Sequence, residues 1–248
     1  MPKDKTNRGR VTPTLRRSSR LSKDHNSIKT TTQKNGEQAH PITKRHSRSS
    51  EHKRPLRITI KTNDMVEIQT ILASSTFDVN KIDEFGRTPI YYAAEYNKIE
   101  IAKLLIENGA DVGFADRNEC LIFNAVYDGD VEMVELLLSS GARASHTFGK
   151  YGSLLHIAAE FNFVEIVDLL IGYGADISYR DERSGNFTPF HSAIFERNFD
   201  LAKEKLFNQE LIWDVRSEEA NRALVKWLDE EGHVEIKNWL TDKMKKKD

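Results

Sequence analysis

Short apolar stretches alternate with turn-forming residues along most of this chain. Within residues 83–116, Leu104 and Leu105 belong to an apolar stripe at helical spacing. Thr88-Pro89 favours the start of a preceding helix, because proline at the first turn loses no needed N–H and threonine caps free amides. Gly109 marks a helix end, because glycine accepts the left-handed conformation found there. The stretch therefore predicts two short helices between turns.

The same pattern recurs at a nearly constant period. Ala93 recurs as Ala125, Ala158 and Ala193, at steps of 32, 33 and 35 residues. A Leu-Leu pair and a Gly-Ala pair recur in register with it, as Leu104-Leu105, Leu136-Leu137 and Leu169-Leu170, and as Gly109-Ala110, Gly141-Ala142 and Gly174-Ala175. A fixed period in this range is typical of a solenoid built from stacked helical units.

The residues at the predicted helix starts indicate the type of repeat. Thr88-Pro89-Ile90-Tyr91, Leu154-Leu155-His156 and Thr188-Pro189-Phe190-His191 resemble the ankyrin repeat, and the resemblance covers roughly residues 55–242. It implies an all-α solenoid of about six helix-turn-helix units, with degenerate units as caps at both ends. The expected units are 55–82, 83–115, 116–147, 148–180, 181–214 and 215–242, followed by a frayed Lys-rich end at 243–248.

Charge divides the chain at the start of this domain. Residues 1–54 hold 15 Lys and Arg against four Asp and Glu, whereas residues 55–248 hold 22 against 34. The first segment has almost no branched apolar or aromatic residues, so we expect a disordered basic tail. Lys44-Arg45 and Lys53-Arg54 are candidates for nuclear import or for contacts with a nucleic-acid backbone, and a solvated linker is the alternative.

Two modification sites are candidates. Ser19 and Ser22 lie in a basic context that resembles a kinase site, where phosphate would subtract charge from the tail. Asn80, after Asp78-Val79, lies in a context that resembles the one in which ankyrin domains are hydroxylated on asparagine. A structural asparagine in a turn is the alternative favoured for this residue.

The positions that the ankyrin pattern leaves free predict a binding surface. After the small residues of each inner helix stand one acidic and one aromatic residue: Glu95-Tyr96, Tyr127-Asp128, Glu160-Phe161 and Phe195-Glu196. Stacking would align them on the concave face, where aromatic rings attract cations and carboxylates pair with Lys or Arg. Phe85 and Arg87 at the loop tips would widen the surface. The alternative is that the acids confer solubility and the rings pack laterally.

The sequence contains no strong catalytic motif. The sequence has no phosphate-binding glycine loop, Cys-x-x-Cys pair or His-Glu-x-x-His motif. Cys120 and His156 are a conceivable nucleophile and base, but His156 and His191 occupy a position where the resemblance implies a structural histidine. We expect no catalytic residues, no metal and no cofactor.

The expected function is therefore non-catalytic binding of a protein, with a basic peptide or basic surface as the favoured ligand. Three alternatives remain open: the tail docks on the acidic surface, the tail tethers nucleic acid or chromatin, or the protein is an exported effector of an intracellular pathogen. One cysteine and the absence of an apolar run or signal peptide favour a reducing cytoplasmic or nuclear compartment, in a host cell for an effector, without a membrane span.

Overall fold

The computed structural model describes residues 56–113, 115–116, 119–148, 152–181, 185–208 and 218–245. Internal contacts divide the chain into residues 1–49 and residues 50–248, and every described residue belongs to the second unit. The predicted basic tail, with the candidate sites Ser19 and Ser22, lies outside the described residues. The fold below is that of the second unit.

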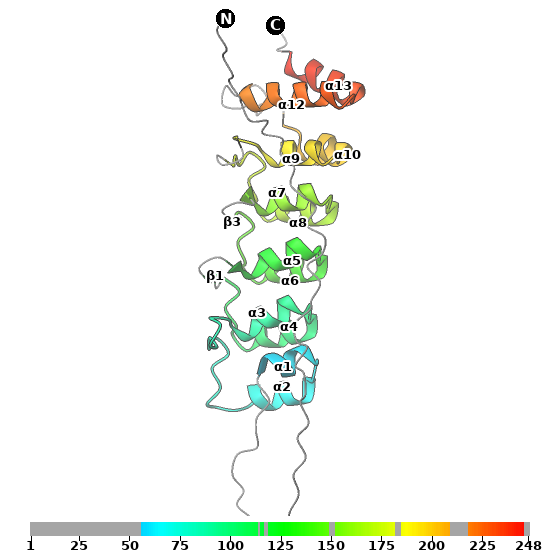
Figure 1. The fold of residues 1–248 in the computed structure, drawn as a ribbon. Helices are drawn as coiled ribbons and strands as arrows, with labels where there is room; N and C mark the ends of the chain where they lie inside the picture. The colour runs from blue at the N-terminus through cyan, green and yellow to red at the C-terminus, as the bar shows by residue number, and fades with distance from the viewer. Residues whose placement is uncertain are drawn as a thin grey trace, which may run out of the picture. The chain divides into compact units, whose positions relative to one another are not determined.

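The fold is an all-α solenoid in which pairs of short helices follow one another along a stack (Figure 1). Each pair consists of an inner helix, a tight turn and an outer helix. The helices are α1 (Leu56–Lys61), α2 (Met65–Leu72), α3 (Pro89–Glu95), α4 (Ile99–Glu107), α5 (Leu121–Asp128), α6 (Val131–Ser139), α7 (Leu154–Glu160), α8 (Val164–Gly172), α9 (Pro189–Phe195), α10 (Phe199–Leu201), the π-helix η3 (Ala202–Leu206), α12 (Glu218–Glu230) and α13 (Val234–Met244).

Short antiparallel hairpins connect the middle pairs. Strand β1 (Ala115–Asp116) pairs with β2 (Glu119–Cys120), and β3 (Thr147–Phe148) pairs with β4 (Gly152–Ser153). An isolated bridge joins Asp181 to Phe187 before α9. The hairpins bring the chain back to the start of the next inner helix.

Every turn between an inner and an outer helix contains one residue with positive φ. Asparagine or glycine holds this position in five of the six described turns, because these residues tolerate the left-handed conformation best. Arg197, with φ of 65°, is the exception. The six residues are Asn63, Asn97, Gly129, Asn162, Arg197 and Gly232.

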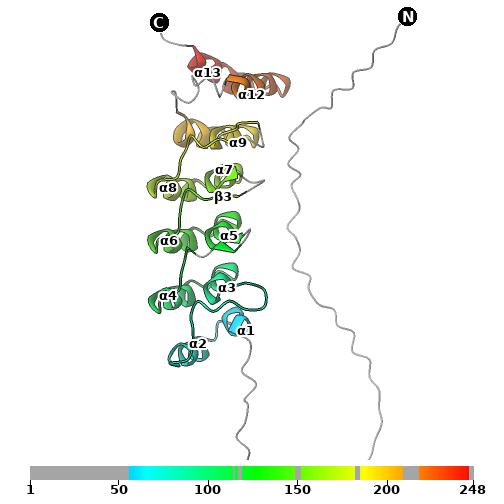
Figure 2. The same cartoon turned by 90° about the vertical axis from the view of Figure 1, so that its left-hand side faces the viewer.

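The inner and outer helices form two layers, as Figure 2 shows, with α3, α5, α7 and α9 in one and α4, α6 and α8 in the other. Ala93, Ala125 and Ala158 are at most 1% exposed, which lets the inner helices pack closely on one another. The outer helices contribute the larger buried side chains, among them Leu105, Leu137 and Leu170. The repeated Ala and Leu positions thus form one continuous core.

The outer helix of the fifth pair is irregular. The short helix α10 continues directly into the π-helix η3, in which Glu204 and Lys205 stand where other repeats have the Leu pair. In the sequence, these two charged residues break the Leu-Leu repeat, and such a break favours a shifted or partly exposed helix. The last pair then packs through aromatic contacts, with the Trp239 ring 4.9 Å from Phe207 and 6.4 Å from Phe190.

Candidate functional site

The predicted surface residues lie where each inner helix ends. Glu95 and Glu160 are the last residues of α3 and α7, and Tyr96 and Phe161 follow them as C-caps. Aligned on the buried alanines, one position carries Glu95, Tyr127, Glu160 and Phe195, and the next carries Tyr96, Asp128, Phe161 and Glu196. Acidic and aromatic residues therefore alternate along both rows. We call these eight residues the acidic–aromatic surface.

The middle of this surface exposes two aromatic rings that contact each other. Tyr127 is 40% exposed and Phe161 is 43% exposed, and their ring centroids lie 5.4 Å apart in an edge-to-face arrangement. Phe123 stacks on Tyr127 at 5.8 Å, and Phe163 stacks on Phe161 at 5.6 Å. Exposed rings held by packing on one side offer contact area at low entropic cost.

The N-terminal end of the surface is occupied by the protein's own cations. Arg87 pairs with Glu95 at 3.6 Å, and its guanidinium lies 4.5 Å from the Tyr91 ring centroid. The Lys61 ammonium lies 5.5 Å from the ring of Tyr96, which is half-buried. Glu95 and Tyr96 therefore each have a cation of the protein itself beside them.

The acidic residues in the middle of the acidic–aromatic surface differ from Glu95 in their electrostatic surroundings. Burial, with the nearby charge of Glu196, raises the pKa of Glu160. Among the described residues, Asp128, Glu160 and Glu196 form no ion pair. The described part of the chain thus supplies no partner cation to these three carboxylates.

At the C-terminal end of the acidic–aromatic surface, the ring of Phe195 packs on other aromatic rings, and the acidic residues that follow in α12 and its turn form ion pairs. The Phe195 ring lies 5.0 Å from Phe187 and 5.1 Å from Trp227, so it is only partly exposed. Glu231 accepts a hydrogen bond from Arg197 at 2.9 Å, and Glu230 lies 3.8 Å from Lys226. Asp128, Glu160 and Glu196, which have no ion pair among the described residues, thus lie between two ends at which acidic residues pair with the protein's own Arg and Lys side chains.

Known proteins share the repeat pattern that builds this surface. A family model described as ankyrin repeats (3 copies) matches residues 22–116 and 122–211, about three quarters of the chain. The chain belongs to the ankyrin-repeat family. The match ends before α12, so the last helix pair of this ankyrin-repeat protein lies beyond it, and residues 22–55 of the match lie outside the described residues.

Several ankyrin-repeat relatives share part of the chain. The human transient receptor potential cation channel subfamily V member 5 is 32% identical over 182 residues, which cover 64% of this chain and 24% of the channel. The nuclear factor NF-kappa-B p105 subunit of Gallus gallus is 27% identical over a region that covers 50% of this chain and 13% of the relative. A putative ankyrin repeat protein of Rickettsia bellii is 25% identical over a region that covers 49% of this chain and 22% of the relative. The similarity thus spans less than a quarter of each of these relatives.

Ankyrin repeats generally mediate protein–protein interaction and are generally not catalytic. In the part of the chain that the structure describes, no helix is long and apolar enough to cross a membrane. No group of three His, Cys, Asp or Glu residues in that part is arranged to hold a metal ion.

The two histidines of the ankyrin motif join neighbouring repeats. His156 accepts the Ser153 N–H at Nδ1, and its Nε2 lies 3.0 Å from the Phe187 carbonyl oxygen of the next repeat. His191 binds Thr188 in the same way, and its Nε2 lies 3.1 Å from Asn221 Oδ1 on α12. Burial lowers the pKa of both, that of His191 to about 3. The Cys120 side chain is outside the described part.

The loop-tip residues differ in their surroundings. Phe85 is 53% exposed, with the Arg57 guanidinium 4.9 Å from its ring. Asp83 holds this loop by accepting hydrogen bonds from the Phe85 and Arg87 N–H groups and from the Tyr92 hydroxyl at 2.6 Å. Burial acts to raise the pKa of Asp83, but these hydrogen bonds outweigh it and the pKa lies below its usual value. Burial and the bond to Asp83 raise the pKa of Tyr92 to about 12.

Asn80 uses both ends of its side-chain amide to contact the next repeat. Its Nδ2 donates to the Gly109 carbonyl at 3.0 Å, and its Oδ1 accepts the Asp111 N–H at 2.8 Å. These contacts give the residue a structural role between the first and second helix pairs. Its hydroxylation stays a prediction.

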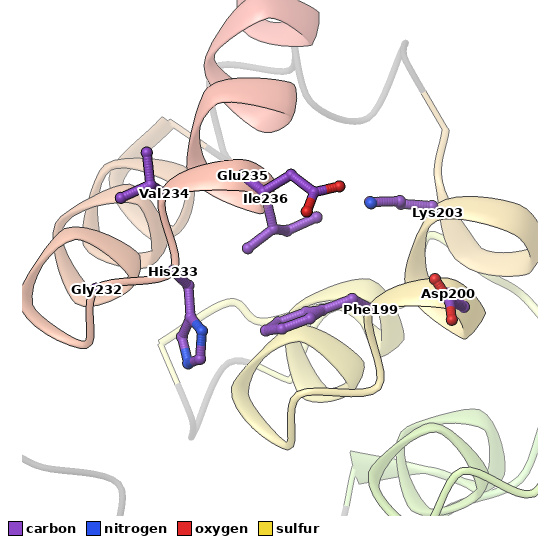
Figure 3. A pocket seen from close by; sticks show the side chains of 8 residues that line it. All are labelled: Phe199, Asp200, Lys203, Gly232, His233, Val234, Glu235 and Ile236. Carbon is purple, nitrogen blue, oxygen red and sulfur yellow. The ribbon is translucent and has the colours of Figure 1, made fainter.

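The sequence did not predict a cavity of about 430 Å³ between the fifth and sixth pairs, which Figure 3 shows. It lies between the starts of α10 and α13, where Nε2 of His233 is buried without a hydrogen-bond partner. The loss of the Leu pair in repeat five is the sequence signal that indicated irregular packing here. The cavity is lined by Phe199, Asp200, Lys203, Gly232, His233, Val234, Glu235 and Ile236.

Proposed function

We propose that this ankyrin-repeat domain is a non-catalytic interaction module that binds a basic segment of a partner protein through the acidic–aromatic surface. The observation that carries the proposal is the exposed Tyr127–Phe161 pair beside acids that have no cation of their own among the described residues. Aromatic faces attract cations, and carboxylates form charge-assisted hydrogen bonds with Lys and Arg.

Binding of labelled peptides to the full-length protein tests this proposal. The probe is a fluorescent peptide of alternating Arg and Gly, with a peptide of alternating Glu and Gly as the charge control. The double variant Tyr127→Ala, Phe161→Ala should bind the basic peptide at least about tenfold more weakly, because truncating an aromatic anchor typically costs more than about 1 kcal/mol. Added salt should weaken the binding of the wild-type protein.

The matched control truncates exposed apolar residues of the outer helices. Val66 on α2 is 75% exposed, and Tyr173 at the end of α8 is 46% exposed. The double variant Val66→Ala, Tyr173→Ala should bind as the wild type does. Equal affinity of both double variants would place the binding elsewhere and reject the proposal.

The charge division favours a second candidate, a nucleic-acid tether formed by residues 1–54. Substituting Gln for Lys44, Arg45, Lys53 and Arg54 should lower affinity for duplex DNA and reduce its salt dependence by up to about 0.9 per lost phosphate contact. Unchanged DNA binding would reject this role. Tighter binding of the basic peptide by the same variant is the result expected if the segment docks on the acidic–aromatic surface.

A further inference from the structure

The domain contains its own example of a cation bound to this surface. Arg87 precedes α3 and Glu95 ends it, and the two side chains pair at 3.6 Å. The guanidinium also lies 4.5 Å from the Tyr91 ring centroid. An arginine between a carboxylate and an aromatic face combines ion pairing with cation–π attraction.

The same two positions recur in the other repeats. Phe187 and Phe195 occupy them in repeat five, and their rings lie 5.0 Å apart, so the two positions are neighbours there as well. In repeat four they are held by Gly152 and Glu160. Glu160 is therefore the counterpart of Glu95, but a glycine stands where Glu95 has its arginine.

The structure disfavours a side chain at Gly152. Its φ is +71°, a conformation that side chains disfavour, and a Cβ atom would lie 3.0 Å from Cγ and 3.2 Å from Nδ1 of His156. The His156 ring is held in place by Ser153 and by the Phe187 carbonyl oxygen. A cation for Glu160 cannot come from this position of the chain.

The surroundings of Glu160 favour a cation from outside. Its carboxylate is half-buried, has no ion pair among the described residues and is repelled by Glu196. Helix α7 packs between α5, which carries Tyr127, and α9, which ends at Phe195. Phe161 directly follows Glu160 and contacts Tyr127, and Phe195 contacts Phe187. In repeat two, Arg87 likewise has both a carboxylate and an aromatic ring beside it.

We propose that Glu160 receives an arginine side chain of the partner protein, which supplies the cation that Gly152, lacking a side chain, does not. This inference rests on the proposed function and names the residue of the partner that repeat four recognises. Arginine fits better than lysine, because its planar guanidinium forms bidentate hydrogen bonds with a carboxylate, stacks on aromatic rings and is less strongly hydrated than an ammonium.

Three short peptides test the proposal on the full-length protein by NMR titration. They are acetyl-Gly-Arg-Gly-amide, the same peptide with lysine, and the same peptide with citrulline, a neutral isostere of arginine. The arginine peptide should cause saturable shifts in the amides at the ends of α7 and α9. The lysine peptide should bind several-fold more weakly, and the citrulline peptide should cause no saturable shift.

Two isosteric variants identify the carboxylate. Glu160→Gln should weaken binding of the arginine peptide at least about tenfold, because a charge-assisted pair is lost. The matched control Glu95→Gln should leave it unchanged, because Arg87 already occupies Glu95. Circular dichroism of both variants checks that they fold.

The outcomes separate this inference from the proposed function. Equal binding of the arginine and lysine peptides, no effect of Glu160→Gln, or no saturable shift with the arginine peptide overturns the assignment of Glu160. If the longer basic peptide still depends on Tyr127 and Phe161 in that case, the proposed function stands alone. If it does not, both fail.

Discussion

The turn between α5 and α6 offers a sharp test of how the middle repeats pack. Gly129 has φ of +77°, and a Cβ atom there would lie 2.8 Å from Cζ and 2.9 Å from Cε1 of Phe163. Real Cβ atoms do not approach a ring so closely, so Gly129→Ala must displace the ring or the turn. The Phe163 ring cannot move freely, because it stacks on Phe161, which in turn contacts Tyr127.

Two costs add in this variant. The left-handed conformation costs an alanine about 1–2 kcal/mol, and crowding a packed ring costs about 1–3 kcal/mol. Gly129→Ala should therefore lower the free energy of unfolding by about 2–5 kcal/mol. Gly232 occupies the equivalent turn of the last pair with φ of +75°, and a Cβ atom added there would have nothing within 4 Å. Gly232→Ala should show only the first cost.

Urea denaturation followed by circular dichroism at 222 nm measures both variants, with Gly174→Ala as a second control in open space at φ of +84°. Because the effect of alanine on the unfolded chain is common to all three, it cancels in the differences. Adding Phe163→Ala to Gly129→Ala should remove the crowding and give a favourable coupling energy. If Gly129→Ala costs no more than the two controls, the close packing of Phe163 on Gly129 is refuted.

Further predictions concern stability and its pH dependence. Arg197→Asn should raise the free energy of unfolding by about 0.5–1 kcal/mol, because asparagine tolerates positive φ better and an exposed ion pair contributes little; a loss in urea titration would contradict this. Leu137→Ala should cost about 2–5 kcal/mol because the side chain is fully buried, whereas the exposed Val66→Ala should change little in the same assay. The folded-state pKa of His191 is about 3, below that of a histidine in the unfolded chain, because burial disfavours the charged ring. The contribution of the neutral His191 to the free energy of unfolding is therefore fully present above about pH 6.5 and falls as the pH drops toward 3. Stability should decrease by about 2 kcal/mol for this residue between pH 8 and pH 5, and His191→Asn, although less stable at pH 8, should show a correspondingly smaller decrease; an unchanged decrease would contradict the assignment.

The sequence predicted the all-α ankyrin solenoid because its core uses the same residues in each unit. The alanines of the inner helices and the Leu pairs of the outer helices are set by packing between neighbours, and this requirement leaves a visible period. The irregular outer helix of repeat five was also visible, since Glu204 and Lys205 break that period. What a unit needs for stacking can therefore be predicted from sequence.

The properties of individual surface residues were less predictable. Glu95 and Glu160 hold the same place in the pattern, yet Glu95 is paired with Arg87, whereas Glu160 has no ion pair in the part of the chain that the structure describes. The difference depends on a residue eight positions earlier, outside the motif. Likewise, His191 binds an asparagine side chain on α12 where His156 binds a backbone carbonyl, and no motif marks the register of α12 against α9.

The attachment of the last helix pair has a consequence for how the chain opens. Among the described residues, the pair α12–α13 contacts the rest of the domain on the side of repeat five, through Asn221 on His191 and through Trp227 and Trp239 on phenylalanines of that repeat. In a linear stack, the end unit can detach while the others stay folded. Amide protons of α12 and α13 should then exchange with solvent earlier than those of α5 to α8. Each such opening would uncover Phe190 and Phe195, a transient apolar surface on which proteolysis and self-association of the chain would begin.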